Sequence, residues 1–377
     1  MRILKILFAI AVTTFLPGKL FSADPVLFEK SSLNHGATIN STAWSPDGKY
    51  LAVGGDLYDS SVSHRIYKIT NGVMTEVGSG YGAGSPVKEL AWSPDGKFLA
   101  VCMPNGASTT QRVYSISDGV LTETGSAAHG NAARCLCWSP SGKHLVVGGG
   151  VTSGDSGTHR VYEVSSTGSL TVKSFYLHGA YVYSVQYSPD GNYLAIGGAS
   201  GTNSKTHRIY AVDSDGYTLT EIGSYSHGAT INSTAWSSDG KWFAIGGSPA
   251  AGPYRLRIYS ITDGILTLTN SYAGPPNTLY CLQFSPDGKY LTTSNYRNDS
   301  ITHQIYEVSA TGTLTLKSSY DHGSPATYTY SISYSPDGKY IAIGGVAGTD
   351  SKTHRIYRVS TGALTLVDTE SVGGSVS

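Results

Sequence analysis

Histidine is the residue type whose spacing first suggests chemistry in this sequence. Ten of the eleven histidines fall into two repeated positions, one before a glycine and one at the start of a predicted strand. The first set is His35, His129, His178, His227 and His322, and the second is His64, His159, His207, His303 and His354. Neutral imidazole is a common metal ligand, so a ring of metal sites is one interpretation. No Asp, Glu or Cys recurs beside them at ligand spacing, so we expect structural hydrogen bonds from the ring N–H groups, with no metal and no cofactor.

A second recurring pair joins an arginine to a tyrosine two residues later. It occurs in six repeats, for example at Arg65 and Tyr67, and Gln304 replaces the arginine in one further repeat. Residues two apart on a strand project from the same face. We expect these guanidinium groups to stack on an aromatic ring or to donate to a loop carbonyl, in preference to binding phosphate.

Enzyme motifs are missing from the sequence. It has no Gly-x-Ser-x-Gly elbow, no His-Glu-x-x-His and no phosphate-binding loop. The segment from Asp213 to Gly216 resembles the start of a calcium loop, but the later ligand positions are wrong, and an Asp- and Gly-rich turn explains it. We therefore predict no catalytic residue and a protein that is not an enzyme.

The four cysteines are interpreted as small core residues. Cys135 and Cys137 share one face of a predicted strand, Cys102 ends a strand of the preceding repeat, and Cys281 lies three repeats further on. Because an exported protein permits disulfides, a bridge from Cys102 to Cys135 or Cys137 stays open as an alternative.

Composition narrows the classes of partner. The chain has 377 residues with 26 Lys+Arg and 26 Asp+Glu, so its formal net charge is zero. Without a net field that attracts polyanions, nucleic acid and anionic lipid are poor candidates. Only 14% of residues are charged, whereas 46 Gly and 27 Tyr indicate a chain rich in strands and turns.

Residues 1–23 have the pattern of a secretory signal peptide. Arg2 and Lys5 form a positive n-region, residues 6–16 form an apolar h-region, and the small residues Ser22 and Ala23 follow. We expect cleavage after Ser22 or Ala23 and an exported protein, periplasmic or secreted, that is not inserted in a membrane afterwards. A buried N-terminal strand or a short anchor helix is the alternative.

One tetrapeptide, Ser-Pro-Asp-Gly, recurs along the chain. Its seven copies are separated by 48, 46, 49, 49, 48 and 50 residues, with Ser141 in place of Asp in one copy and Ser238 in place of Pro in another. The copies begin at Ser45, Ser93, Ser139, Ser188, Ser237, Ser285 and Ser335. One supersecondary unit is therefore copied seven times.

Each unit contains signals for four short strands. An alternating run ends in an aromatic residue, the Ser-Pro-Asp-Gly turn follows, and a second apolar run usually ends in a Gly pair. After a loop rich in Ser, Thr and Gly, a third strand opens on His-Arg-Ile-Tyr or a relative, and a short Gly turn leads to the fourth. These signals predict an all-β fold, a seven-bladed β-propeller with four antiparallel strands in each blade. A parallel β-helix or open solenoid is the competing architecture.

We expect one propeller domain over residues 24–377. Its repeats span about 35–80, 81–128, 129–177, 178–226, 227–272, 273–321 and 322–370. Residues 26–33 and 363–370 both carry the fourth-strand pattern, so they compete for the outer edge of the last blade. A strand borrowed from the opposite terminus leaves no open seam, so we predict that residues 26–33 close the ring, with 363–370 beside them or displaced.

These features resemble the WD-repeat family over about residues 30–370. The resemblance is carried by the His-Gly pair, the Ser-Pro-Asp-Gly turn, the small residues that end the second strand and the aromatic on the third strand. Tyr replaces the family's Trp in all seven third strands, and the Trp-Asp dipeptide is absent, so the family's usual hydrogen-bond network does not carry over intact. The Ser-Pro-Asp-Gly-Lys-Tyr-Leu-Ala string is also similar to the propeller repeats of bacterial periplasmic Tol-type proteins.

In the WD-repeat arrangement, the connections before the first strand and after the second strand share one face of the disc. Here they are longer than the other connections and differ between repeats, and they mix Tyr with Ser, Gly and Asn as antibody paratopes do. The fifth and sixth repeats stand out because prolines 249, 253, 275 and 276 replace the Gly-Ser pattern. The predicted binding residues are Tyr58, Tyr181, Tyr183, Tyr254, Arg255, Tyr280, Tyr296, Arg297, Tyr328 and Tyr330.

The resulting expectation is an exported, monomeric, non-enzymatic scaffold that binds a protein or peptide through this loop-rich face. A carbohydrate-binding propeller and a propeller hydrolase or lactonase with a central-channel site are the alternatives. An unrepeated cluster of carboxylates or histidines at the channel mouth would favour the enzyme.

Overall fold

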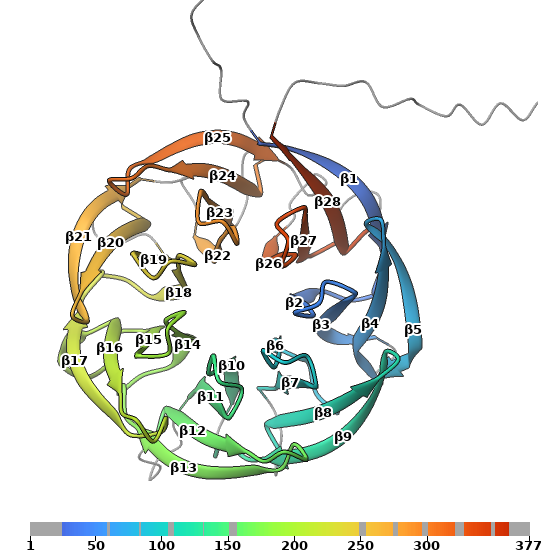
Figure 1. Cartoon of the computed structure of the whole chain (residues 1–377), viewed down its shortest axis with the longest axis horizontal. Coiled ribbons are helices and arrows are strands. Elements are labelled where there is room, and N and C mark those ends of the chain that lie inside the picture. The colour runs from blue at the N-terminus through green and yellow to red at the C-terminus, as the bar shows by residue number, and fades with distance from the viewer. Residues whose placement is uncertain are drawn as a thin grey trace, which may run out of the picture.

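Seven four-stranded antiparallel sheets are arranged as a ring in the computed structural model (Figure 1). The structure describes residues 25–361 except 59–60, 83, 105–108, 131, 151–156, 249–253, 274–277, 296–300, 321–327 and 348–350. In six sheets the first strand in the chain lies nearest the axis and the last lies at the rim, whereas in the seventh the rim strand comes from the start of the described chain. The predicted fold, an all-β seven-bladed propeller, is confirmed. No helix among the described residues is long and apolar enough to cross a bilayer.

The sheets are numbered as blades 1 to 7 in chain order. Blade 1 contains β2 (Ile39–Trp44), β3 (Tyr50–Tyr58), β4 (Val62–Thr70) and β5 (Val73–Tyr81). Blade 2 contains β6 (Glu89–Trp92), β7 (Phe98–Cys102), β8 (Gln111–Ser117) and β9 (Val120–Ala127). Blade 3 contains β10 (Ala133–Trp138), β11 (His144–Gly149), β12 (His159–Val164) and β13 (Leu170–Tyr176). Blade 4 contains β14 (Val182–Tyr187), β15 (Tyr193–Gly198), the short 3-10 helix η1 (Thr202–Ser204), β16 (His207–Val212) and β17 (Leu219–Tyr225).

The remaining blades follow the same order. Blade 5 contains β18 (Ile231–Trp236), β19 (Trp242–Gly247), β20 (Leu256–Thr262) and β21 (Ile265–Tyr272). Blade 6 contains β22 (Leu279–Phe284), β23 (Tyr290–Asn295), β24 (His303–Val308) and β25 (Leu314–Tyr320). Blade 7 contains β26 (Thr329–Tyr334), β27 (Tyr340–Gly345), β28 (His354–Thr361) and, from the other end of the chain, β1 (Pro25–Leu33).

The ring is closed by β1, which pairs antiparallel with β28 at the outer edge of blade 7 (Figure 1). Pro25 lies opposite Thr361, and Leu33 lies opposite His354. The prediction that residues 26–33 form the closing strand is confirmed. Residues 363–370, the competing segment, and residues 1–23, the expected signal peptide, lie outside the described residues.

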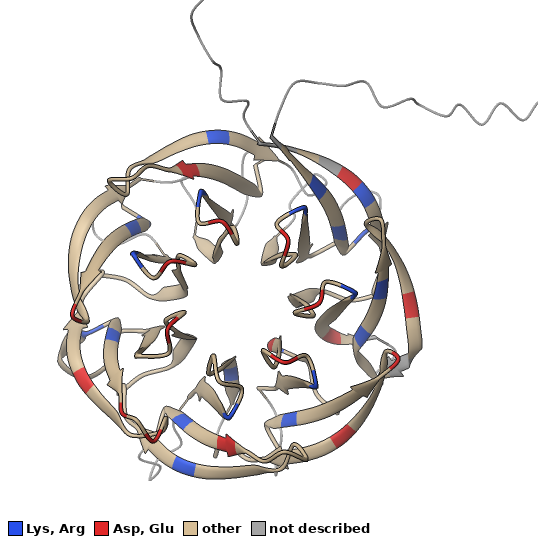
Figure 2. Cartoon of the chain, viewed as in Figure 1, with Lys and Arg blue, Asp and Glu red and all other residues tan. Residues whose placement is uncertain are grey.

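The Ser-Pro-Asp-Gly turn is held by its own side chains. In blade 1, Ser45 Oγ donates to Asp47 Oδ1 at 2.7 Å, and Asp47 Oδ1 also accepts the Lys49 amide at 3.1 Å. Gly48 has a φ of +70°, which favours glycine because it has no Cβ to clash. These turns surround the channel opening that faces the viewer in Figure 2, where most of them carry one basic and one acidic segment.

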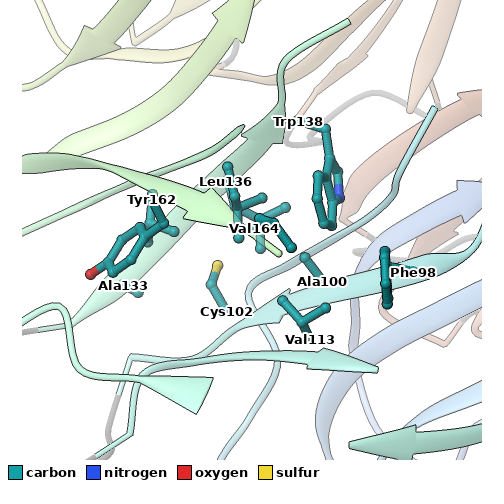
Figure 3. Packing of buried hydrophobic residues seen from close by; sticks show 11 residues of the cluster. Phe98, Ala100, Cys102, Val113, Ala133, Leu136, Trp138, Tyr162 and Val164 are labelled. Atoms are coloured by element: carbon teal, nitrogen blue, oxygen red, sulfur yellow. The ribbon is translucent and has the colours of Figure 1, made fainter. Parts of the chain in front are cut away.

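The hydrophobic core lies between blades. Alternate residues of β7 point to opposite faces of its sheet, as strand geometry requires. Leu99 and Val101 pack in the cluster shared with blade 1, whereas Phe98, Ala100 and Cys102 pack in the cluster shared with blade 3 (Figure 3). Each blade is therefore stabilised by both of its neighbours, and a complete ring leaves no blade with an uncovered face.

In four blades the residue before the turn is a tryptophan that links neighbouring blades by a hydrogen bond as well as by packing. Trp92 Nε1 donates to the Ala43 carbonyl of blade 1 at 3.0 Å, and Trp138 Nε1 donates to the Ala91 carbonyl of blade 2 at 3.0 Å. A buried indole N–H needs such a partner, because leaving it unpaired would cost free energy. These contacts fix the inner strands, which in turn position the walls of the channel.

All four cysteines are free thiols. Cys102 and Cys135 are buried, and Cys137 and Cys281 are partly exposed. The interpretation of these residues as small core residues therefore fits the structure, and the alternative bridge from Cys102 does not form in it.

Candidate functional site

The histidines that open the third strands are buried structural residues. His207 has Nδ1 3.3 Å from Thr206 Oγ1, and its ring stacks on Tyr225 with centroids 5.3 Å apart. It also lies against Tyr259 of the next blade. Burial lowers the pKa of His207 to about 3, with a smaller contribution from the neighbouring His227 and Arg257. This imidazole is therefore neutral and packs between two blades.

His178, the histidine of one His-Gly pair, connects segments of one face. His178 Nε2 lies 2.8 Å from the Ala199 carbonyl, and its Nδ1 accepts a hydrogen bond from Arg208 Nε at 3.2 Å. Burial and the Arg208 charge lower the pKa of His178. For His178 the ring hydrogen bonds agree with the expectation, whereas both ring nitrogens of His227 are buried without a hydrogen-bond partner. No group of three or more His, Cys, Asp or Glu able to hold a metal occurs within the described ranges.

The repeated arginines differ in part from the prediction. Arg160 and Arg257 donate to loop carbonyls, as expected. Arg208 instead pairs with Glu221 on the fourth strand of its own blade at 2.7 Å, and Arg65 pairs with Glu76 at the same distance. These ion pairs are not evident from the sequence, because the partner carboxylates lie on a different strand and occur in only some blades.

An asymmetric site lies in the central channel, a cavity of about 720 Å³ lined mainly by the first strands of the blades. In six blades a β-bulge inserts one extra residue five positions before the turn. Bulges re-aim side chains, and every bulge residue here lines the channel. Together with Lys88 at the same position of blade 2, they form what we call the channel-mouth ring: Asn40, Lys88, Arg134, Tyr183, Asn232, Tyr280 and Tyr330.

The ring lies at the mouth opposite to the Ser-Pro-Asp-Gly turns, on the predicted loop-rich face. Three predicted site residues of blades 6 and 7 meet there. Tyr280 and Tyr330 are 5.1 Å apart between centroids in an edge-to-face arrangement, and Tyr328 stacks on Tyr330 at 5.7 Å. Burial, with the neighbouring Tyr280, Tyr328 and Asp56, raises the pKa of Tyr330 to about 12. The three rings form one aromatic cluster.

A second aromatic group lies across the mouth. Tyr181 and Tyr183 stack with centroids 6.1 Å apart, and the Arg134 guanidinium lies 4.9 Å from the first ring centroid and 5.4 Å from the second. Both tyrosines were predicted from the sequence, but Arg134 was not. Its position in the ring is visible in the sequence only when the seven repeats are aligned on their turns.

Blades 1 and 2 contribute polar groups to the same mouth. Asn40 Nδ2 donates to Asp56 Oδ1 at 3.2 Å and to the Val87 carbonyl at 2.9 Å. Lys88 Nζ lies 3.7 Å from Asp56 Oδ1. These polar and charged groups of blades 1 and 2 lie between the two aromatic groups in the order of the blades.

One carboxyl group lies a single position below the ring. Glu89 Oε2 accepts the Leu136 amide of blade 3 at 2.8 Å, and burial raises the pKa of Glu89 to about 8. Between blades 5 and 6 the same type of hydrogen bond is made by Ser233 Oγ, which accepts the Leu282 amide at 3.0 Å. The other six blades have Ser or Cys at this position: Ser41, Cys135, Ser184, Ser233, Cys281 and Ser331.

Comparisons with known proteins agree with the fold. The family pattern described as "WD domain, G-beta repeat" matches six segments, at residues 29–63, 75–110, 121–163, 169–204, 216–248 and 266–301, which together cover more than half of the chain. The chain belongs to the WD-repeat (WD40) family. No curated protein matches it.

Among solved structures, 1520 chains are similar to this one. One of them is a chain of the "Crystal Structure of Mitotic Checkpoint Complex", which is 19% identical and aligns with a TM-score of 0.65. The alignment covers 93% of this chain and 100% of that one. At this identity the likeness establishes the fold alone.

The remaining predicted site residues of the WD40 propeller lie elsewhere or are not described. Tyr254 is 43% exposed, and the Arg255 side chain donates to the Ala273 carbonyl at 3.0 Å, but neither residue lines the channel. Tyr58 ends β3, and its side chain is not described. Tyr296, Arg297 and prolines 249, 253, 275 and 276 lie outside the described residues.

Glu89 is the residue that sequence reasoning missed most clearly. Every other blade has Ser or Cys at this position, so the only sign of Glu89 in the sequence is one exception among the seven aligned repeats. Asp56, at the end of the second strand of blade 1, is the other described carboxylate that lines the channel.

Proposed function

We propose that this WD40 propeller is an exported scaffold that binds a protein or peptide partner at the channel-mouth ring. The observation that carries the proposal is the contrast between the seven ring positions and the other repeated positions of the blades. Turn, core and histidine positions repeat the same residue types, whereas the seven ring positions hold Asn, Lys, Arg and Tyr. Specific recognition needs such asymmetry on a rigid support.

The chemistry of the ring supports a protein partner. Tyrosine and arginine are enriched among residues that dominate binding energy at protein interfaces. Tyr183 and Tyr330 offer large, rigid contact areas with polar hydroxyls, and Arg134 is already held by ring stacking, so little conformational entropy would be lost on binding. The similar solved chain comes, by its title, from a complex, which agrees with a binding role for this fold.

Export is proposed from residues 1–23. Their positive n-region, apolar h-region and small residues before position 24 are typical of a secretory signal. Peptide sequencing of the N-terminus of the protein, purified from the producing cell, would test it. A protein that begins at Ala23 or Asp24 supports export, whereas a retained Met1 contradicts it.

The binding proposal is tested with the mature chain as bait against proteins of the producing cell and its medium. Partners that bind the wild type but not Tyr330→Ala or Tyr183→Ala support binding at the ring. Phe175→Ala is the matched control, because it removes an aromatic ring that is 57% exposed at the rim of blade 3. Loss of the same partners from this control, or retention by both ring variants, contradicts the proposal.

Glycan binding is the second candidate, favoured by one observation. The stacked pair Tyr328 and Tyr330 presents an aromatic platform at the mouth, a surface on which the apolar face of a sugar ring can stack. A glycan array probed with the mature chain separates the two candidates. Binding to defined glycans that is lost in Tyr330→Ala, without any protein partner, would replace the leading proposal.

A further inference from the structure

Among the described residues, Glu89 is the one carboxyl group set into the channel wall below the ring, and its carboxyl group accepts a single hydrogen bond there. Its Oε2 accepts the Leu136 amide. A carboxylate can accept further hydrogen bonds on both oxygens. Glu89 makes no ion pair with any described residue, although two cations line the same channel.

The neighbouring charged groups are engaged elsewhere. Lys88 Nζ lies beside Asp56 at 3.7 Å, and the Arg134 guanidinium lies over the rings of Tyr181 and Tyr183. Neither cation is among the groups that shift the pKa of Glu89, which burial raises. Among the described residues, the carboxyl group therefore has no positive partner.

The influence of Glu89 extends across the channel. Burial raises the pKa of Cys281 in blade 6 to about 12, and the charge of Glu89 adds to this rise. Burial and Glu89 also raise the pKa of Cys102, Cys135 and Cys137. The Glu89 side chain lines the central channel together with Cys281 of blade 6. It is thus accessible to a group that enters along the axis.

We propose that Glu89 is the recognition group for one cationic side chain, Lys or Arg, which a partner peptide inserts into the channel through the channel-mouth ring. This inference rests on the proposed function and names the partner's chemistry. One residue of strand corresponds to ~3 Å, so a long side chain whose backbone stays at the mouth reaches the position below the ring. Its alkyl part would pass the faces of Tyr280 and Tyr330, which attract cations and cover apolar stems.

Glu89→Ser is the decisive variant, because serine occupies this position in four other blades. Ser41 and Ser233 show that a serine hydroxyl accepts the amide of the next blade. The variant therefore keeps the interblade hydrogen bond and removes only the carboxyl group. Circular dichroism and thermal melts confirm that it is folded before binding is measured.

The first experiment uses n-butylammonium and n-butylguanidinium as probes of the channel, with n-butanol as the neutral control. Binding is followed by tyrosine ring signals in NMR. We expect saturable binding of both cations to the wild type, at least tenfold weaker binding of butanol, and no preference for the cations in Glu89→Ser. Equal responses in wild type and variant overturn the inference, whether or not a protein partner exists.

The pH dependence gives a second readout. A cation binds the ionised carboxyl group, so the wild-type affinity should rise between about pH 6 and pH 9 and the affinity of Glu89→Ser should not. The charged groups that line the channel with Glu89 are Asp56, Lys88 and Arg134, and the thiols coupled to it stay protonated in this range. An unchanged pH profile in the variant contradicts the assignment to Glu89.

A peptide library separates this inference from the proposed function. Seven-residue peptides with mixed flanks carry Lys, Arg, norleucine or Glu at the centre, and fluorescence anisotropy measures their binding. A preference of about tenfold for Lys or Arg that disappears in Glu89→Ser supports the inference. Peptide binding without this preference overturns it and leaves the proposed function intact. Absence of any peptide or protein binding, with cation binding retained, overturns the proposed function instead.

Discussion

The hydroxyl of Tyr320 accepts a hydrogen bond from the amide of Leu27 at 2.8 Å. The same bond joins internal blades, since the Tyr81 hydroxyl accepts the Leu121 amide at 2.8 Å. In each case the tyrosine ends the fourth strand of one blade and the leucine lies on the outermost strand of the next. The closing strand β1 thus takes the place of a fourth strand in both its sheet pairing and its contact with the preceding blade.

Removing this contact should weaken ring closure by a modest amount. Tyr320→Phe leaves the Leu27 amide without its partner, which corresponds to about 1 kcal/mol in the free energy of unfolding. Tyr81→Phe should cost a similar amount, because the geometry is the same. Deletion of residues 25–33 should cost much more, since it exposes the edge of β28 and one face of the blade 6 core. Guanidinium unfolding measures all three, and a deletion variant as stable as Tyr320→Phe would contradict closure by β1.

Buried neutral histidines predict loss of stability in acid. Burial lowers the pKa of His64, His159 and His207 to about 3, whereas the ordinary value is 6.5. Between these values the unfolded chain binds more protons, so the free energy of unfolding falls as the pH falls. We expect the melting temperature to decline from about pH 6.5 downwards, well above the range in which carboxylates titrate.

A variant with a precedent in the chain tests this assignment. Gln111 is buried at the start of the third strand of blade 2. Most of the other blades have histidine at this position. His207→Gln should therefore fold and should show a shallower decline of the melting temperature between about pH 6.5 and 4.5 than the wild type. Identical slopes would show that His207 is not responsible.

Much of this fold follows from repetition in the sequence. The spacing of the Ser-Pro-Asp-Gly turns predicted seven units, and the duplicated fourth-strand pattern predicted closure by residues 26–33. Both predictions depend on local signals that occur many times, so single exceptions do not obscure them. The tyrosines of the mouth were also found, because aromatic residues among Ser and Gly are visible without knowledge of their contacts.

The details of the site depend on features that the alternation of apolar and polar residues along a strand does not reveal. A β-bulge at Arg134 and its equivalents turns these side chains toward the channel, and a two-residue period alone does not place them there. The aromatic clusters of the mouth also contain residues from different blades, such as Tyr280 of blade 6 and Tyr330 of blade 7. Glu89 was missed because it replaces a small residue in a position interpreted as scaffold.

The cysteines should be unreactive in the folded protein. Burial, with the added charge of Glu89, raises the pKa of Cys281 to about 12, and burial raises the pKa of Cys135 well above its ordinary value. The thiolate is the reactive form, so little of it is present near neutral pH. Iodoacetamide should label none of the four free thiols in the native state and all four after unfolding. A mass lowered by the two hydrogens of a disulfide would contradict this thiol state.

Glu89→Ser should be more stabilising at alkaline pH than at acidic pH. The folded-state pKa of Glu89 is raised to about 8 from an ordinary 4.5, so its protonated form favours folding and stability is lost as the pH rises through about 8. Serine does not ionise and keeps the hydrogen bond to the Leu136 amide. The gain in unfolding free energy from pH 6 to pH 9 should exceed about 1 kcal/mol, since each tenfold change in proton affinity corresponds to about 1.4 kcal/mol. A difference independent of pH would show that the carboxyl group is not perturbed.

Arg134 should act in binding through its planar group as well as its charge. The guanidinium lies over two stacked rings, Tyr181 and Tyr183, and an ammonium group cannot reproduce this planar contact. Arg134→Lys should therefore weaken binding of a captured partner about as much as Arg134→Ala, roughly tenfold. If charge alone matters, Arg134→Lys will bind like the wild type.

The control for Arg134 is a cation on the opposite face. Lys97 follows the turn of blade 2, and its side chain is 72% exposed beside Asp95. Lys97→Ala removes one positive charge without touching the mouth, so partner affinity should stay within about twofold of the wild type at low and high salt. Isothermal titration with the captured partner measures the three variants. A loss in Lys97→Ala equal to that in Arg134→Ala would point to net charge instead of the stacked arginine, and would place binding outside the channel-mouth ring.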